Sequence, residues 1–257
     1  MKKNAQSIIP DKQRLAPGLL IAALIALWQL VSVSGLVPAF MLPSPLAVVK
    51  ALRADISLLG RDLLVTLSEA IIGLVLAIVA AFIIAIIMDS NALLNRAVFP
   101  LLLFTQTVPA IAIAPLLVLW MGYGIAPKVA LIFLTCFFPV TVGLIGAFAQ
   151  TDKEAVQLLR SMGASQWQIY AYLKLPGAMP AFFAGLRIAA SYSIVGAVIA
   201  EWLGGNAGLG VYMTRVRKSY SFDKMFAVIL LTAALSLALI KLVVFIQKKS
   251  LPWQEED

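Results

Sequence analysis

Long runs of apolar residues, separated by short polar segments, fill most of this chain of 257 residues. A helix needs about 20 mostly apolar residues to cross the hydrocarbon of a bilayer. Six segments meet this requirement, so the pattern predicts an all-α, polytopic membrane protein with six transmembrane helices. The segments lie at approximately 15–34, 69–88, 98–121, 127–148, 181–203 and 225–246.

The third of these segments differs from the others because Pro100, Pro109 and Pro115 interrupt it. An interior proline removes a backbone donor and kinks a helix. The freed carbonyls must then be satisfied by protein or water, which predicts a segment that faces protein or a pathway. Gln106 and Thr107 precede Pro109, and these three residues are candidates for lining a polar path. Hydrogen bonding between helices is an equally good interpretation of the two polar side chains.

A polar module at residues 149–180 separates the fourth and fifth apolar segments. Its apolar positions 155, 158, 159 and 162 have the spacing of one helical face. Gly163 interrupts this pattern and Ser165 is a good cap for a second helix, so two short helices joined at Gly163 are expected. The module should end at Pro176, because the residue before a proline is disfavoured in helical geometry.

Two interpretations fit these amphipathic helices. One is a helix that lies on the membrane surface, a class that favours a polar face rich in Lys and Arg. The module instead carries Glu154, Gln157, Gln166 and Gln168 with few cations. That composition favours a surface that fits a protein groove.

Composition places the whole chain in the membrane class. Hydrophobic residues make up 62%, charged residues 12%, and the mean hydropathy is +0.98. A typical soluble domain is about 45–50% apolar and about 25% charged. The net charge of +8 does not indicate nucleic acid, because the basic residues are dispersed at the ends of apolar runs rather than clustered on one face.

The chain offers little catalytic or metal-binding chemistry. It has no histidine and one cysteine, Cys136, so the commonest metal ligand and general base are missing. The glycine-rich stretch GGNAGLG at 204–210 has no following Lys, so no phosphate-binding loop is present. We therefore expect a protein that is not an enzyme and holds no cofactor or metal, with any ATP and Mg²⁺ bound by another chain.

Glu201 is the ionisable residue that stands out in the apolar segments, since it follows an uncharged run at 188–200. An acid inside the membrane is a candidate functional residue, here in a translocation path. The competing interpretation is that Trp202 and the adjacent glycines mark the interface, so that the Glu201 carboxylate is already in water.

Six spans place both chain ends on the same side of the membrane. With that side cytoplasmic, eleven Lys and Arg lie inside and eight outside, a weak preference under the positive-inside rule. The expected organisation is an N-terminal tail, first span and outer loop (1–62), a core (63–250) that includes the module at 149–180, and a polar tail (251–257).

The module also resembles the cytoplasmic loop of permeases from bacterial ABC importers, the binding-protein-dependent transport family. That loop has the pattern E-A-A-x-x-x-G-x(9)-I-x-L-P. Gly163 matches its glycine, Leu173 its isoleucine, and Leu175 with Pro176 its closing pair. The pattern's Glu-Ala-Ala falls on residues 157–159, which are Gln-Leu-Leu here, and Glu154 with Ala155 lies one turn earlier.

The resemblance extends to 42–52, 107–124 and 185–210 and is greatest to the branch that imports nitrate, taurine, alkanesulfonates and pyrimidine precursors of thiamine. It implies a permease subunit in the bacterial inner membrane, with both termini cytoplasmic. It also implies three protein partners: a dimer of ABC ATPases, an extracytoplasmic substrate-binding protein and a second permease copy, most simply an identical one. The residues it assigns to ATPase coupling are Glu154, Gln157, Leu158, Leu159, Gly163, Ala164, Ser165, Leu173, Leu175 and Pro176.

Two other function classes remain open from the residues alone. A secondary transporter driven by an ion gradient would need ionisable residues deep in its spans, and Glu201 is the best candidate. A membrane scaffold without transport activity would need no polar residues along a path.

Overall fold

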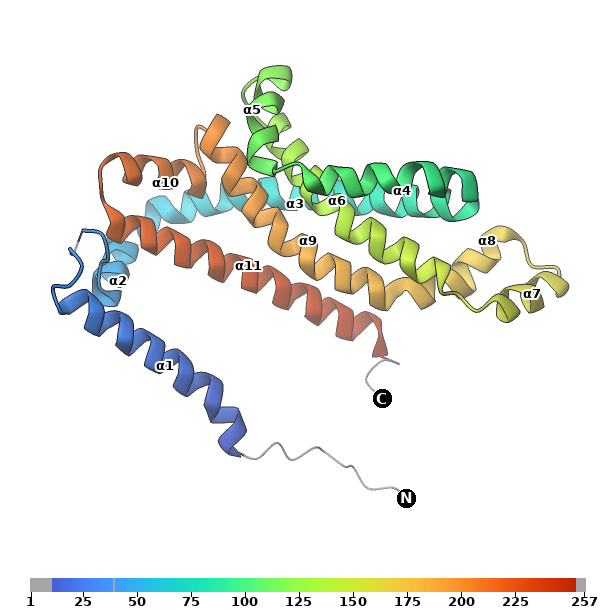
Figure 1. Ribbon diagram of the computed structural model, residues 1–257, viewed down its shortest axis with the longest axis horizontal. Helices are drawn as coiled ribbons and strands as arrows, with labels where there is room; N and C mark the ends of the chain where they lie inside the picture. The colour runs from blue at the N-terminus through green and yellow to red at the C-terminus, as the bar shows by residue number, and fades with distance from the viewer. Residues whose placement is uncertain (1–10, 39, 253–257) are drawn as a thin grey trace. The chain divides into compact units, whose positions relative to one another are not determined.

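The computed structural model describes residues 11–38 and 40–252, and every regular element in that part of the chain is a helix (Figure 1). The predicted all-α class is therefore confirmed. In chain order the helices are α1 (Asp11–Val33), α2 (Pro45–Ala54), α3 (Ile56–Ser90), α4 (Ala92–Thr107), α5 (Ala110–Met121), α6 (Ile125–Ala149), α7 (Lys153–Ser161), α8 (Gln166–Ile169), the π-helix η1 (Tyr170–Lys174), α9 (Leu175–Gly204), α10 (Leu209–Lys218) and α11 (Phe222–Ser250).

The helices form two compact units, each described here by itself. The first contains the chain up to Ile56 together with Arg215–Ile229, and the second contains Ser57–Thr214 together with the chain from Leu230 onward. The organisation expected from the sequence, with a boundary at residues 62 and 63, stays a prediction.

The first unit is held together by a small apolar cluster. Val48 and Ala51 of α2 are buried with Ala227 at the start of α11. Trp28 of α1 packs at its edge and donates a hydrogen bond from Nε1 to the Pro43 carbonyl over 3.0 Å. A half-buried ion pair of 2.7 Å between Lys224 and Asp55 joins the two chain segments of this unit.

The second unit is built around α6 and α9, which pack along one another, with α3, α4 and α5 against them. The core-facing side of α3 carries small residues, Gly73 and then Ala77, Ala81 and Ala85 at every fourth position, the three alanines being fully buried. Small residues at this spacing let helix backbones approach closely. A Cβ on Gly73 would collide with the Ile132 side chain of α6, which shows how close that approach is.

The helix count agrees with the prediction only in part. Four helices in the described part of the chain are long and apolar enough to cross a membrane: α3, α6, α11 and the continuous helix Gln166–Gly204. The predicted third span is a bent pair, α4 and α5, and the apolar part of α1 described here, Gly18–Val33, is shorter than the others. The fold class therefore holds, while the count of six stays a prediction.

The bend in the third segment lies at Pro109. The axes of α4 and α5 meet at 99°, with Val108 and Pro109 extended between them. Pro100 and Pro115 lie inside α4 and α5, which continue through them. Of the three prolines that predicted kinks, Pro109 alone breaks the helix, because it follows an extended residue and cannot donate a backbone hydrogen bond to α4.

Candidate functional site

The turn at Gly163 confirms the predicted joint in the polar module. Asp152 caps α7 by accepting a hydrogen bond of 2.8 Å from the Glu154 amide. At the other end, the Gly163 amide donates to the Arg160 carbonyl and the Ala164 amide to the Leu159 carbonyl, each over 2.9 Å. These two bonds form a Schellman motif, which places its C′ residue in the left-handed region. Gly163 has φ +82°, so a glycine suits this position.

The second short helix begins as predicted, with Ser165 as its cap. The Ser165 hydroxyl accepts from the Gln168 amide, while the Gln168 side chain accepts from the Ser165 amide over 2.7 Å, a complete capping box. The expected end of the module at Pro176 is wrong. The chain stays helical through η1, where the Leu175 amide donates to the Tyr170 carbonyl, and Pro176 lies in the first turn of α9. The widened hydrogen-bond pattern of η1 thus carries the helix into the proline, within the continuous helix Gln166–Gly204.

The α7 helix leaves part of its apolar face uncovered. The side chains of Leu158 and Met162 are 62% and 74% exposed, while Ala155 and Leu159 of the same face are half-buried. A surface helix normally buries such a face against its own core. The exposed part of this face is therefore available to another molecule.

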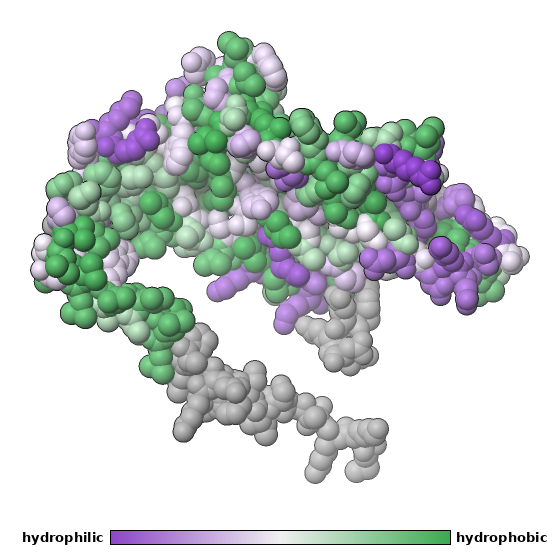
Figure 2. Space-filling model, viewed as in Figure 1, coloured by the Kyte–Doolittle hydropathy of each residue, from purple (hydrophilic) through white to green (hydrophobic). Residues whose placement is uncertain are grey.

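Two aromatic side chains add to the exposed apolar surface of this region, since Trp167 and Tyr172 are 70% and 76% exposed. The ribbon shows α7 and α8 projecting beyond the ends of α6 and α9, and hydrophilic residues gather around them with apolar residues between (Figures 1 and 2). Exposed aromatic residues within a polar rim are typical of protein interfaces.

The residues assigned to coupling by resemblance extend from α7 through the turn and η1 to the start of α9, and they do not lie on one face. Leu158 and Leu159 belong to the apolar face of α7, and Gly163, Ala164 and Ser165 form the turn. The Glu154 side chain is exposed and forms no hydrogen bond or ion pair within the part of the chain that the structure describes. Gln157 lines a cavity behind α7, Leu173 lines a second cavity beside α6, and Leu175 and Pro176 begin α9.

A cluster around Asp89 joins the module to the end of α3. The Asp89 carboxylate accepts hydrogen bonds from the Tyr170 hydroxyl and from the Lys174 ammonium, each over 2.5 Å. The Tyr170 ring also packs edge-on against Phe148 of α6, with centroids 5.8 Å apart. Both donors belong to η1, so this segment is bonded directly to the end of α3.

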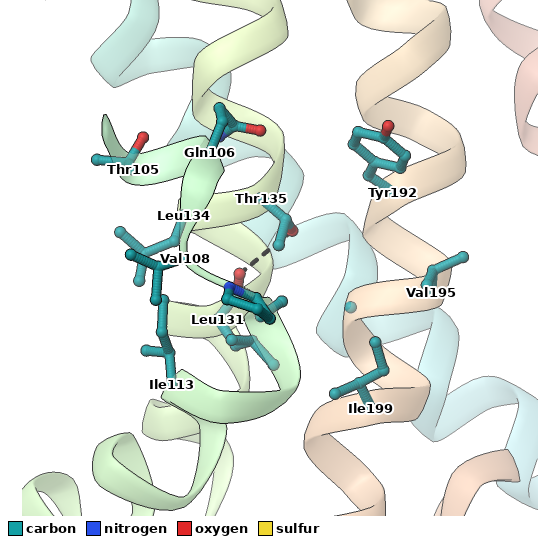
Figure 3. Close-up of a pocket in the computed structure, with 13 residues that line it drawn as sticks. Thr105, Gln106, Val108, Ile113, Leu131, Leu134, Thr135, Tyr192, Val195 and Ile199 are labelled. Carbon is teal, nitrogen blue, oxygen red and sulfur yellow. Dashed lines mark hydrogen bonds between the residues drawn. The ribbon is translucent and has the colours of Figure 1, made fainter. Parts of the chain in front are cut away.

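A pocket of about 260 Å³ lies beside the break between α4 and α5 (Figure 3). Its polar side chains are Thr105 and Gln106 from α4, Thr135 from α6 and Tyr192 from α9. The Thr135 hydroxyl already bonds the Leu131 and Ile132 carbonyls, which leaves Gln106 and Tyr192 as the groups best able to bind a ligand. The remaining lining residues are apolar, and no charged residue is among them.

Two of the three residues predicted at this bend line the pocket. Gln106 and Pro109 do so, whereas Thr107 lies outside it and donates its hydroxyl to the Phe104 carbonyl within α4. The sequence did not single out Tyr192 or Thr135, since one polar residue in an apolar helix gives no signal of its own.

Glu201 lies outside this pocket, and its carboxylate is not in water, because the residue is 1% exposed. Its oxygens accept hydrogen bonds from the Thr66 hydroxyl over 2.7 Å and the Gly210 amide over 2.6 Å. The expectation that the Glu201 carboxylate lies in water is therefore wrong. Through these two hydrogen bonds, Glu201 links α3 to the loop that follows α9.

Other buried polar groups surround Glu201. Glu69 of α3 and Lys128 of α6 form an ion pair of 2.6 Å, and both side chains are at least 93% buried. Asp62 accepts from the Gly208 amide over 3.1 Å. Sequence analysis did not identify this network, although Asp62, Thr66 and Glu69 are spaced by four and three residues, which places them on one face of a helix.

Comparisons with known proteins agree with these features. The family model described as "Binding-protein-dependent transport system inner membrane component" matches residues 73–252. A "Probable ABC transporter permease protein" of Haemophilus influenzae is 36% identical over 88% of this chain and 92% of that protein. "Formylaminopyrimidine transport permease protein ThiX" of Halalkalibacterium halodurans is 35% identical over 95% of this chain and 98% of that protein.

A solved structure confirms the fold. The "MetNI methionine ABC transporter", in an inward-facing conformation, superposes with a TM-score of 0.62 over 75% of this chain and 98% of the matched chain, at 16% identity. These relatives are permeases that act in ABC importers, and none supports the ion-gradient alternative. The chain therefore belongs to the binding-protein-dependent transport system inner membrane components, as the membrane-spanning permease subunit of an ATP-driven importer.

Proposed function

We propose that this permease imports a neutral heteroaromatic solute of the formylaminopyrimidine class. The observation that carries this proposal is the lining of the pocket beside the α4–α5 break, which offers the Gln106 amide and the Tyr192 ring among apolar side chains and no charge. A flat ring with hydrogen-bonding edges can stack on an aromatic side chain and bond an amide. The relative named as a formylaminopyrimidine permease supports the same class.

The anionic substrates of other relatives fit this pocket less well. Permeases named for aliphatic sulfonates in Bacillus subtilis and for taurine in Escherichia coli are 29% and 26% identical to this chain. A sulfonate taken from water into a largely apolar pocket loses hydration that only cations or several donors can replace. The pocket lining has no Lys or Arg, so sulfonate and nitrate are the weaker candidates.

A second, identical permease copy would complete the path. Ile188, Tyr192 and Val195 of α9 share one helical face and are each about half exposed, at 50%, 47% and 49%. Tyr192 and Val195 also line the pocket, which is thus open on this side to whatever covers α9. A symmetric pair that meets along this face would enclose the solute between two copies of the same lining.

The projecting module docks on the ATPase in this proposal. Its apolar face on α7 fits a protein groove, and the turn at Gly163 presents that face beyond the membrane-spanning helices. The module is then cytoplasmic, as are both chain termini, and an extracytoplasmic binding protein delivers the solute from the other side. ATP and Mg²⁺ are bound by the ATPase dimer, and this chain holds no cofactor.

Nucleotide-driven closure of the ATPase dimer acts on the pocket through helices of this chain. Movement of α7 and α8 passes through η1 into α9, which carries Tyr192, and through Asp89 into α3. The closed ATPase changes the permease only as far as it binds one of its conformations more tightly than the other.

The test is uptake by the importer reconstituted into liposomes with its ATPase and binding protein. Formylaminopyrimidine should accumulate in the liposomes only when ATP is present on the side of the membrane that carries the ATPase. Excess taurine should not reduce formylaminopyrimidine uptake. Tyr192→Ala should reduce uptake while the binding protein's own affinity for the solute is unchanged. Taurine uptake at a higher rate than formylaminopyrimidine uptake would contradict the substrate class, and uptake driven by an ion gradient alone would contradict ATP-driven import.

A further inference from the structure

The cavity behind α7, which Gln157 lines, has a volume of about 370 Å³ and lies between α7 and the ends of α3 and α6. The face of α7 that lines it is the one opposite the exposed apolar face. Residues 153, 156, 157 and 160 have helical spacing, and all four line the cavity. The docking surface on α7 and this cavity are therefore on opposite sides of one short helix.

The lining of the cavity is rich in cations. Lys153 and Arg160 reach it from α7 and Lys174 from η1, while Asp89 is the one acidic residue among the lining groups. Lys174 is already paired with Asp89. Neither Lys153 nor Arg160 forms an ion pair within residues 11–38 and 40–252, so two uncompensated positive charges face the same space.

Neutral donors complete this lining. Gln157 lies one turn after Lys153, so its amide reaches the cavity with the guanidinium and the ammonium groups, while the Thr151 hydroxyl in the lining donates to the Ala147 carbonyl over 3.5 Å. A planar guanidinium with nearby ammonium and amide donors suits the several oxygens of a phosphate group. An uncharged solute would gain less from these cations than an anion would.

The geometry points to a binding site for a phosphate-bearing anion in this cavity, held by Lys153, Arg160 and Gln157. This inference is independent of the transported solute and of ATPase docking, because it concerns the face of α7 that the docking surface does not use. The anion brings one or two negative charges to the uncompensated cations. Its source is the free phosphate group of a solute or the headgroup of an acidic lipid.

Occupancy of the site would affect the joint between the module and α3. Lys174 contacts the cavity and also donates to Asp89, so a bound phosphate competes with Asp89 for the same ammonium. The Tyr170 hydroxyl would remain on Asp89. The anion would thus shift the position of η1 and of α7 relative to the end of α3.

Equilibrium dialysis of the purified full chain against labelled inorganic phosphate tests the site, in maltoside micelles free of phospholipid. The variant Lys153→Gln/Arg160→Gln should bind phosphate at least about tenfold more weakly, since it loses both uncompensated positive charges and their hydrogen bonds to the anion. The matched control is Arg96→Gln/Lys249→Gln, which removes two exposed cations outside the cavity and should bind like the wild type. Gln157→Glu, which adds a carboxylate to the lining, should also weaken binding, and gel filtration monitors folding of every variant.

A second measurement separates the two sources of the anion. The chain is released from nanodiscs of equal parts phosphatidylcholine and phosphatidylglycerol, and retained lipid is counted by native mass spectrometry. Retention of phosphatidylglycerol that the double variant loses and the control keeps identifies a lipid headgroup. Phosphate binding in micelles without such retention identifies a free phosphate. If the double variant and the control behave alike in both measurements, the site does not exist.

Discussion

Among single residues, Glu201 shows how a buried carboxylate stabilises a glycine-rich loop. Its two oxygens accept from Thr66 and from the Gly210 amide, and Leu209 donates in turn to the Thr66 hydroxyl over 2.9 Å. A Cβ on Gly208, where φ is +118°, would collide with the Glu201 carboxylate. Gly208 and Gly210 therefore make room for an acid rather than for a phosphate.

Replacement of this carboxylate should destabilise the protein. In Glu201→Gln one acceptor becomes an NH₂ group that faces a donor, and a buried group left unsatisfied costs about 1–3 kcal/mol. We expect a lower midpoint of thermal unfolding for the purified chain in micelles. The control Glu154→Gln changes an exposed residue and should alter stability by no more than about 0.5 kcal/mol. Equal midpoints for the two variants would show that the network around Glu201 contributes nothing to stability.

The residues that sequence reasoning placed correctly are those whose role is local. Gly163 and Ser165 form a turn and a cap with partners within five positions of themselves. Glu201 and Thr66 are 135 positions apart, and the hydrophobic pattern of either helix contains no information about the other. The burial of Glu201 thus became evident only from the packing of α9 against α3.

At the scale of elements, the orientation of α7 is the feature most closely tied to function. The helix is too short to be stable alone, because an isolated helix of fewer than about 12–15 residues is marginal in water. Within this chain its half-buried residues are Ala155, Val156 and Leu159, while Leu158 at the edge of the apolar face and Met162 after the helix are exposed. Its stability should increase when a partner covers that apolar face.

A pair of neighbouring substitutions on α7 distinguishes its two faces. Leu158→Glu places a charge in the centre of the apolar face and should abolish copurification with the ATPase, because an unpaired charge is costly in an interface. Gln157→Glu introduces the same charge on the cavity side, next to Lys153 and Arg160, and should leave copurification intact. The measurement is the ratio of ATPase to permease after affinity purification of each variant.

The reverse result would reassign the docking surface. If Gln157→Glu released the ATPase and Leu158→Glu did not, the cavity side of α7 would be the face that docks. Loss of copurification in both variants would instead show that docking depends on the whole of α7. The variant Gly163→Leu, which strains the left-handed turn by about 1–2 kcal/mol, would then test whether copurification also depends on the turn.

The ends of helices were predictable where the composition changes sharply from apolar to polar. They were less predictable where an irregular backbone hydrogen bond or a buried polar contact lets the helix continue. The ends of α6 at Ile125 and Ala149 lie within two residues of the predicted 127–148. The predicted stop at Pro176 failed because a π-helical turn supplies a bond to the Leu175 amide just before the proline. Likewise, α3 begins at Ile56, well before the predicted start at residue 69, and in this extension Asp62 accepts from the Gly208 amide and Thr66 donates to Glu201.

At the scale of the whole molecule, the membrane topology decides which segments of the chain can meet the ATPase and which can meet the binding protein. The helix Gln166–Gly204 and α11 are both long and apolar enough to cross a membrane. The helix α7 precedes the first of these helices, and the cationic end of α10 lies between them in the chain. If both cross the membrane, alternation along the chain predicts Ser161 and Ser250 on one side and Lys218 on the other.

Cysteine labelling tests this arrangement directly, because the chain has one cysteine, Cys136, which is fully buried and can be replaced by alanine. Single cysteines at the exposed positions Ser161→Cys, Lys218→Cys and Ser250→Cys are treated with a maleimide that does not cross membranes. In intact cells only Lys218→Cys should react, whereas inside-out vesicles should label Ser161→Cys and Ser250→Cys. Labelling of Ser161→Cys in intact cells would place the module outside the cell, where no cytoplasmic ATPase could reach it. That result would contradict both the proposed topology and the proposed docking of α7 on the ATPase.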